Sequence, residues 1–162
     1  MKKLIIVRHA KSSWKHDVID HERPLESRGF TDAKIVSDEL KKVVLSVDFV
    51  ISSDANRAKT TAELFISNLN IDRNLLKFNH DLYDFSGNKL LNTIKSTNNE
   101  SECLMVFGHN YAITFLVNKL GDRYIDNVPT CGVVIIEFDI HDWSSLKPGK
   151  TIKTIFPRDL KK

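Results

Sequence analysis

Four residues that could do chemistry on an oxyanion follow apolar runs of the sequence directly or closely: Arg8, His9, Arg57 and His109. A neutral imidazole is a competent nucleophile toward phosphorus. Guanidinium groups bind oxyanions through several donors at once, and a protonated imidazole stabilises charge on a transferring phosphoryl group. The set therefore predicts phosphoryl chemistry that needs neither a metal nor a nucleotide.

Each of these residues also has a simpler interpretation. A single histidine at a strand end is usually a surface or hydrogen-bonded structural residue, and a single arginine there is usually solvated. These interpretations would have to hold independently at three places in the chain. The coincidence favours one shared site.

Arg57 raises a separate electrostatic question. If Asp54 is the N-cap of the helix that follows, Arg57 lies in its first turn, where the helix dipole disfavours a cation by a few tenths to about 1 kcal/mol. An anion bound between Arg57 and the helix N-terminus would compensate. Pairing of Arg57 with Asp54 is the alternative.

The elements that must position these residues alternate along the chain. Unbroken apolar runs predict strands over residues 3–7, 48–52, 103–107, 132–138 and 151–156. Apolar residues at helical spacing predict helices over residues 27–44, 55–69 and 110–120, with a short one after Gly87. Residues 96–102 are polar and predict a surface loop.

Buried strands that alternate with amphipathic helices indicate an α/β protein whose sheet is covered on both faces. We expect a three-layer α/β/α sandwich with a mainly parallel central sheet, formed by one domain over residues 1–162. Ligands of such sheets bind beyond the carboxyl ends of the strands. The predicted strand ends therefore place Arg8, His9, Arg57 and His109 at the same edge.

Composition excludes several other classes of protein. The 162 residues carry a net charge of +3, and aromatic residues do not alternate with the basic ones, so we expect no nucleic-acid partner. No apolar stretch has the length of a membrane span or of a signal-peptide core, so we expect a cytoplasmic protein without membrane contact. Cys103 and Cys131 have no metal-binding spacing and are expected to be small buried residues. No P-loop or dinucleotide-binding glycine motif occurs.

Several motifs resemble those of the histidine phosphatase superfamily, which has the phosphoglycerate mutase-like fold. They are "VRHA" at 7–10, "SSDANRAKTTAE" at 52–63 and "GHN" at 108–110. The segments "RHAKSSW" at 8–14 and "RPLESRG" at 23–29, with the C-terminal pattern over 130–160, are similar to the small SixA-type phosphohistidine phosphatases. The similarity extends over nearly the whole chain.

This resemblance implies a role for each candidate residue. His9 would be the nucleophile that becomes phosphorylated, and water would then hydrolyse the phosphohistidine. Arg8 and Arg57 would bind the phosphoryl oxygens, and His109, with Asn110 beside it, would complete the phosphate site. No cofactor or metal is implied.

The chain departs from the superfamily pattern at two positions. Ala10 stands where the superfamily commonly has glycine, so the backbone there must be one that alanine adopts. Glu26 stands where relatives often have a threonine N-cap, and we expect Ser27 to cap the helix instead. Trp14 could belong to a loop over the pocket rim, but we expect it in the core.

A general acid is the least defined part of the predicted site. Mutase-like relatives use a glutamate in the segment that corresponds to residues 80–91, and here that segment offers only Asp81 and Asp84. Either aspartate could serve as an acid, but a turn or helix-capping role is more common.

A phosphohistidine leaving group has little need of such an acid, and short connections indicate an open groove. The resemblance therefore implies that the substrate is protein phosphohistidine, carried by a phosphotransfer protein. A phosphatase or mutase of small phosphorylated metabolites is the alternative enzyme, and a non-catalytic phospho-ligand-binding module is the alternative of another class.

Overall fold

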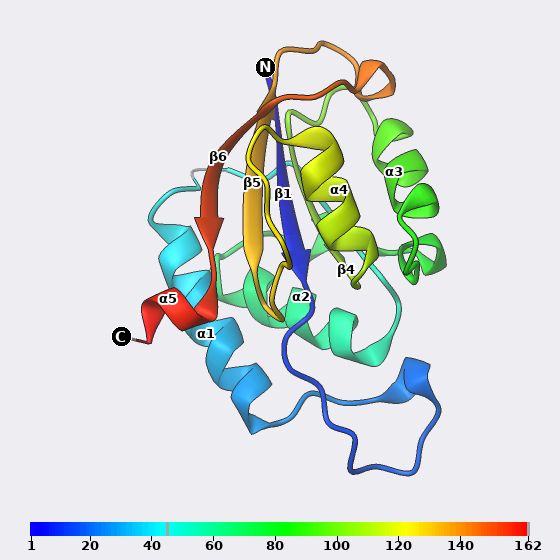
Figure 1. The fold of residues 1–162 in the computed structure, drawn as a ribbon, viewed down its shortest axis with the longest axis vertical. Coiled ribbons are helices and arrows are strands. Elements are labelled where there is room, and N and C mark those ends of the chain that lie inside the picture. The colour runs from blue at the N-terminus through cyan, green and yellow to red at the C-terminus, as the bar shows by residue number, and fades with distance from the viewer. Residues whose placement is uncertain (45, 162) are drawn as a thin grey trace.

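The computed structural model describes residues 1–44 and 46–161, and one six-stranded sheet forms its centre (Figure 1). The strands lie in the order β3-β2-β4-β1-β5-β6. Their bounds are β1 Lys2–Arg8, β2 Phe49–Ser52, β3 Leu76–Phe78, β4 Cys103–Gly108, β5 Val133–Phe138 and β6 Lys150–Ile155. The first four are mutually parallel, whereas β5 is antiparallel to both β1 and β6. The prediction of a mainly parallel sheet is confirmed.

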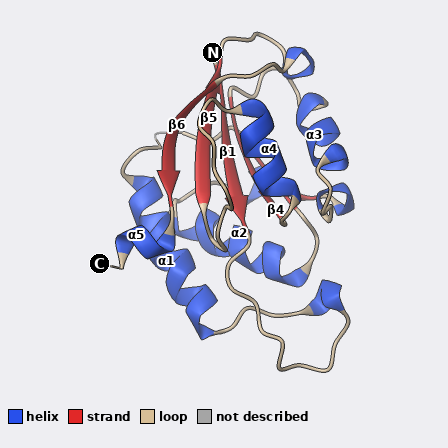
Figure 2. Ribbon diagram, viewed as in Figure 1, coloured by secondary structure: helices blue, strands red, loops and turns tan. Residues whose placement is uncertain are grey.

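Helices cover both faces of this sheet, as Figure 2 shows by the coloured elements. They are α1 Ser27–Lys41, α2 Asn56–Asn68, α3 Asn88–Lys95, α4 Ala112–Leu120 and the short α5 Pro157–Leu160. None of the helices in the described part of the chain combines the length and the apolar character of a membrane span.

Two apolar cores result from the alternation of side chains along the buried strands. Leu4 and Ile6 of β1 pack with the inner faces of α3 and α4. Ile5 and Val7 of the same strand pack with α1 and α2 on the opposite face. Because β1 is buried on both sides, its residues read as a continuous apolar run. The predicted α/β/α sandwich is therefore observed, and α4 lies in front of the sheet in Figure 1.

The ends of the helices differ from the sequence prediction in physical detail. α1 ends at Lys41, before the predicted limit at residue 44, and Val43 is exposed. The N-cap of α1 is Glu26, which makes no side-chain capping bond, so the prediction that Ser27 takes this role is wrong. Four 3₁₀ turns, β3 and α5 were not predicted, because elements of three or four residues have no periodicity to detect.

The register of β1 and β4 brings two predicted site residues together. Arg8 pairs with Gly108 across these parallel strands, so the next residue of each strand, His9 and His109, emerges at the same edge. The chain after β1 then extends beyond this edge as the long blue segment in Figure 1. That segment contains the 3₁₀ turn η1, Asp20–Glu22.

A glycine controls how the chain enters α3. Gly87 is the N-cap of α3 and has φ +110°, and a Cβ atom there would lie 2.5 Å from Cδ2 of Phe115. The segment just before it contains Tyr83 and Phe85, whose rings pack near the ring of His109. The conformation of Gly87 therefore shapes one wall of the site.

We predict that Gly87→Ala lowers the free energy of unfolding by at least about 1–2 kcal/mol, because alanine is disfavoured at this φ and its Cβ would overlap Phe115. Urea unfolding followed by circular dichroism measures the change. Gly108→Ala is the matched control, since a Cβ atom there has no neighbour closer than 3.5 Å. Equal losses in the two variants would contradict the prediction.

Candidate active site

The four predicted residues line one cavity of about 280 Å³ at the carboxyl edge of the sheet. Arg8 and His9 come from the end of β1, Arg57 from the start of α2, and His109 from the end of β4. Other residues that line the cavity include Lys11, Asp20, Arg23, Phe85, Asn110 and Thr130. The structure thus brings together all four residues that the strand ends predicted.

His9 is buried, and hydrogen bonds fix both its backbone and its ring. Its backbone N–H donates to the carbonyl of Gly108, and the carbonyl of His9 accepts from the N–H of Cys131. Its ring Nδ1 lies 2.8 Å from the carbonyl oxygen of Ala10. Because a carbonyl only accepts, Nδ1 carries the proton and Nε2 keeps its lone pair. Burial lowers the pKa of His9 to about 3, with the nearby charge of Arg57 acting in the same direction.

His109 has an unsatisfied donor in the cavity wall. Ser53 Oγ accepts the N–H of Ala55, and among the described residues Nε2 of His109, at 2.8 Å, is the one acceptor within reach of its hydroxyl, so the tautomer that satisfies this hydroxyl has Ser53 donating to Nε2. Nδ1 of His109 then carries the proton, and this buried atom has no partner among the described residues. Burial lowers the pKa of His109 to about 2. An oxygen ligand would satisfy the unpaired N–H.

Two arginine side chains face the same cavity with spare donors. Nη1 of Arg8 donates to the carbonyl of Val128 at 2.9 Å, and both Nη atoms of Arg57 donate to Asp20. Within the described chain, the buried Nε atoms of Arg8 and Arg57 have no partner. Burial, reinforced by the charge of Arg57, lowers the pKa of Arg8, but a guanidinium stays ionised. The site therefore concentrates positive charge, carried by the buried Arg57 and the half-buried Arg8.

Asp20 is the carboxylate that partly neutralises this charge, and it is a site residue that no motif in the sequence predicts. Its Oδ2 lies 2.9 Å from Nη2 of Arg57 and 2.5 Å from the hydroxyl of Tyr83. Its Oδ1 accepts from Nη1 of Arg23 at 3.2 Å. Desolvation opposes ionisation of Asp20, but hydrogen bonds from Tyr83 and Arg57 outweigh it and hold the pKa of this carboxyl well below its usual range. Asp20 thus accepts a hydrogen bond from Nη2 of Arg57, a donor that a bound oxyanion would otherwise use.

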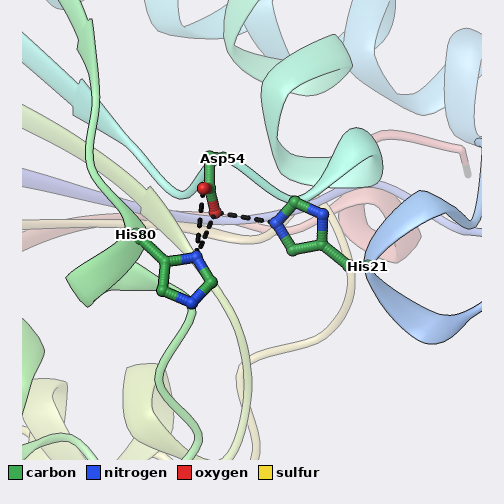
Figure 3. Close-up of side chains that lie close together, drawn as sticks. All are labelled: His21, Asp54 and His80. Carbon is green, nitrogen blue, oxygen red and sulfur yellow. Dashed lines mark hydrogen bonds and ion pairs between the residues drawn. The ribbon is translucent and has the colours of Figure 1, made fainter.

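Asp54 has neither of the roles that the sequence predicted. The N-cap of α2 is Ala55, and Arg57 pairs with Asp20 rather than with Asp54. The prediction that Arg57 lies in the first turn of this helix is confirmed, because α2 begins at Asn56. Asp54 instead accepts hydrogen bonds from His21 and His80 (Figure 3).

Asn110 lies at the cavity, and its amide supports the loop that holds Arg8. Its Oδ1 accepts from the hydroxyl and the N–H of Thr114, and the same hydroxyl accepts the N–H of Val128. The carbonyl of Val128 in turn receives Arg8. This chain of bonds gives Asn110 a positioning role, and direct phosphate binding by Asn110 stays a prediction.

The two candidate acids lie outside the cavity. Asp84 is buried and accepts four backbone N–H groups, from Ser86, Gly87, Lys89 and Leu90. Although burial opposes it, these bonds lower the pKa of Asp84. Asp84 is therefore a cap for the start of α3, and the exposed Asp81 lines a different hollow. Neither aspartate is placed to protonate a leaving group in the cavity.

Two further residues resolve questions that the sequence raised. Ala10 is fully buried and donates its N–H to Thr61 Oγ1, and it is not among the described residues with positive φ, so no glycine is needed there.

Trp14 is 75% exposed at the cavity rim, with Arg23 stacked 3.2 Å from its ring centre. The prediction that Trp14 is a core residue is wrong, because this cation–π contact replaces apolar burial. Both cysteines are buried and free, as predicted.

Comparison with protein families agrees with this arrangement. The model of the histidine phosphatase superfamily (branch 1) matches residues 4–79, a segment that contains Arg8, His9 and Arg57. This match covers just under half of the chain. An uncharacterized protein of Mycobacterium tuberculosis is 27% identical to it over 153 residues, which are 88% of this chain and 93% of the relative.

Solved structures share the fold over most of the chain. The structure of the protein histidine phosphatase SixA complexed with tungstate superimposes with a TM-score of 0.83 at 20% identity, over 98% of this chain and 99% of that one. Phosphoglycerate mutase from Bacillus anthracis superimposes with a TM-score of 0.62 at 18% identity, over 88% and 94%. The predicted phosphoglycerate mutase-like fold is confirmed.

We predict that Asp20→Asn strengthens binding of inorganic phosphate roughly fivefold, which corresponds to about 1 kcal/mol. The substitution removes a negative charge beside Arg57 and keeps the size of the side chain. Isothermal titration calorimetry measures the affinity. Asp17→Asn, at an exposed position of the same loop, is the control and should bind as the wild type does. Weaker binding by Asp20→Asn would show that Asp20 assists the ligand rather than competing with it.

The lowered histidine pKa values predict a loss of stability in acid. Between about pH 3 and pH 6.5 the unfolded state binds protons on His9 that the folded state does not, so the free energy of unfolding falls as pH falls through this range. From pH 7 to 5 we expect His9 to contribute up to about 2 kcal/mol of this loss. Urea unfolding of His9→Gln should show a smaller pH dependence than wild type. The exposed-site variant His141→Gln should match wild type, and an unchanged slope in His9→Gln would contradict the assignment.

Proposed function

We propose that this protein is a phosphatase that works through a covalent phosphohistidine on His9. The observation that carries the proposal is the neutral, immobilised ring of His9, with its lone pair on Nε2, beside the unsatisfied donors of Arg8, Arg57 and His109. Nucleophile and oxyanion donors of this kind suit phosphoryl transfer by positioning and electrostatic stabilisation.

The reaction follows from these roles. Nε2 of His9 attacks phosphorus as the bond to the leaving group breaks. Arg8, Arg57 and the Nδ1–H of His109 bind the phosphoryl oxygens, which displace the Asp20 carboxylate from Arg57. Water then attacks phosphorus, the bond between His9 and phosphorus breaks, and inorganic phosphate leaves. Phosphate oxygens or solvent take up the proton of this water.

We propose protein phosphohistidine as the substrate. The carboxyl that lines the cavity, Asp20, is held ionised by Arg57, so it is a poor acid for an alkoxide leaving group. An imidazole leaving group takes a proton from solvent more readily. Trp14, Phe85 and Tyr111 are large exposed side chains close to the catalytic residues in space or sequence, and they offer contact area to a protein partner. The structural likeness to the protein histidine phosphatase SixA is in keeping with this proposal.

Small phosphorylated metabolites are the second candidate substrate class. Lys11 and Arg23 also line the cavity, and their positive charge could bind a second anionic group of a small molecule. The likeness of fold to a phosphoglycerate mutase is compatible with such a ligand. Turnover of the two classes of substrate separates the alternatives, and a module that binds without catalysis would turn over neither.

We predict acid-labile, base-stable phosphate on the wild-type enzyme after brief incubation with a phosphohistidine-bearing phosphotransfer domain. His9→Ala should carry no label, and Arg57→Ala should lose most of its tungstate affinity while keeping its circular dichroism spectrum. Rapid-quench labelling with ³²P and phosphoamino-acid analysis give the readout.

The exposed His141 supplies the control, since His141→Ala should be labelled like wild type. Label on His9→Ala would overturn the nucleophile assignment. Faster turnover of small phosphate esters than of the phosphorylated domain would favour the metabolite phosphatase, and binding without turnover of either would favour the non-catalytic module.

A further inference from the structure

Three potential metal ligands converge beside the candidate active site, as Figure 3 shows. His21 comes from η1, Asp54 from the turn between β2 and α2, and His80 from the 3₁₀ turn η3, His80–Leu82. Nε2 of His21 lies 2.8 Å from Oδ1 of Asp54, and Nδ1 of His80 lies 3.0 Å from each carboxylate oxygen. Three segments that are distant in sequence therefore direct one ligand atom each toward a common point.

These separations are close to the edges of a metal coordination shell. Nitrogen and oxygen ligands lie about 2.0–2.2 Å from a zinc-like ion, so the ligand atoms of a tetrahedral shell lie roughly 3.3–3.6 Å apart, slightly more than the 2.8 and 3.0 Å observed. The three ligand atoms lie within 4.8 Å of one another. Small rotations of the side chains would admit an ion between them. We propose that His21, Asp54 and His80 form a binding site for a divalent transition-metal ion such as Zn²⁺.

The donor set selects the class of metal. Two imidazole nitrogens and one carboxylate oxygen suit Zn²⁺, Co²⁺, Ni²⁺ or Cu²⁺, whereas Mg²⁺ and Ca²⁺ prefer oxygen donors throughout. The side chains of His21 and Asp54 are about one-third exposed, at 30% and 31%, and that of His80 is 70% exposed. Solvent can therefore deliver the ion and fill its remaining coordination positions. The competing explanation is a pair of simple histidine–carboxylate hydrogen bonds.

The proposed metal site is linked to the oxyanion cavity through adjacent residues. His21 follows Asp20, whose carboxylate pairs with Arg57. The ring of Tyr83 packs against both histidines of the metal site, with centroids 4.9 and 5.6 Å away, and its hydroxyl donates to Asp20. A bound ion would fasten η1 to the turn after β2 and to η3. It would thereby hold Asp20 on Arg57 and weaken oxyanion binding.

Competition between the protein and a chromophoric chelator for Zn²⁺ tests the site directly. Wild type should bind one equivalent through this cluster. His80→Ala and Asp54→Asn should each lower the affinity at least about tenfold, since even outer-shell partners of a metal commonly contribute that much. His16→Ala, an exposed histidine of the same long loop, should bind as wild type. Co²⁺ bound to wild type should give a visible spectrum that His80→Ala lacks.

One further variant, His9→Ala, separates this site from the candidate active site. His9→Ala should retain Zn²⁺ binding. If His9→Ala loses Zn²⁺ binding while His80→Ala retains it, the ion binds to the histidines of the oxyanion cavity and the proposal is overturned. Equal affinity of wild type, Asp54→Asn and His80→Ala would also overturn it. These measurements do not depend on phosphatase activity.

Tungstate affinity tests the link between the sites. One equivalent of Zn²⁺ should weaken tungstate binding to wild type severalfold and leave that of His80→Ala unchanged. Unchanged tungstate affinity in zinc-loaded wild type would refute the link.

Discussion

Two guanidinium cations, the half-buried Arg8 and the buried Arg57, line one cavity, and this is the constraint on which the site depends. Like charges in a poorly solvated place repel one another and lose hydration energy. Two features of the surroundings reduce this cost. The two cavity histidines stay neutral, and the carboxylate of Asp20 forms an ion pair with Arg57. Among the residues that the structure describes, Nε of each arginine and Nδ1 of His109 still have no hydrogen-bond partner. The cavity is therefore built for a ligand that carries more than one negative charge.

The sheet supplies the geometry that this constraint requires. β1 lies between β4 and β5, and backbone hydrogen bonds from both sides fix the chain at His9. Apolar side chains on both faces of the strand prevent it from shifting, because any displacement would disturb two cores at once. A nucleophile with little rotational freedom loses little entropy when it meets its target.

The sequence was sufficient for the parts of the structure that have a local or periodic signature. Apolar runs identified five of the six strands, and the polar residues at three strand ends identified four of the residues that line the cavity. The three-residue β3 has too few residues for such a signature.

Contacts between distant residues were the parts that sequence could not supply. Asp20 lies 37 positions before its partner Arg57, in a loop without regular pattern. Asp54 looked like a helix cap because its type and position fit one, yet two histidines from other segments compete for its carboxylate. Trp14 looked like a core residue because of its size, and its stacking on Arg23 could not be read from spacing. His21 and His80 are separated by 59 positions, far from any metal-binding motif.

The turn η1 has no buried residue, and polar contacts such as the ion pair of Asp20 with Arg57 attach it to the rest of the molecule. Its detachment would expose little apolar surface, so the free energy of local opening is small compared with that of global unfolding. Amide hydrogens in this turn should exchange with solvent far sooner than those of β1. The wall of the cavity formed by the end of β1 thus opens only when the core unfolds. The wall formed by η1 can open for a bulky ligand while both apolar cores stay intact.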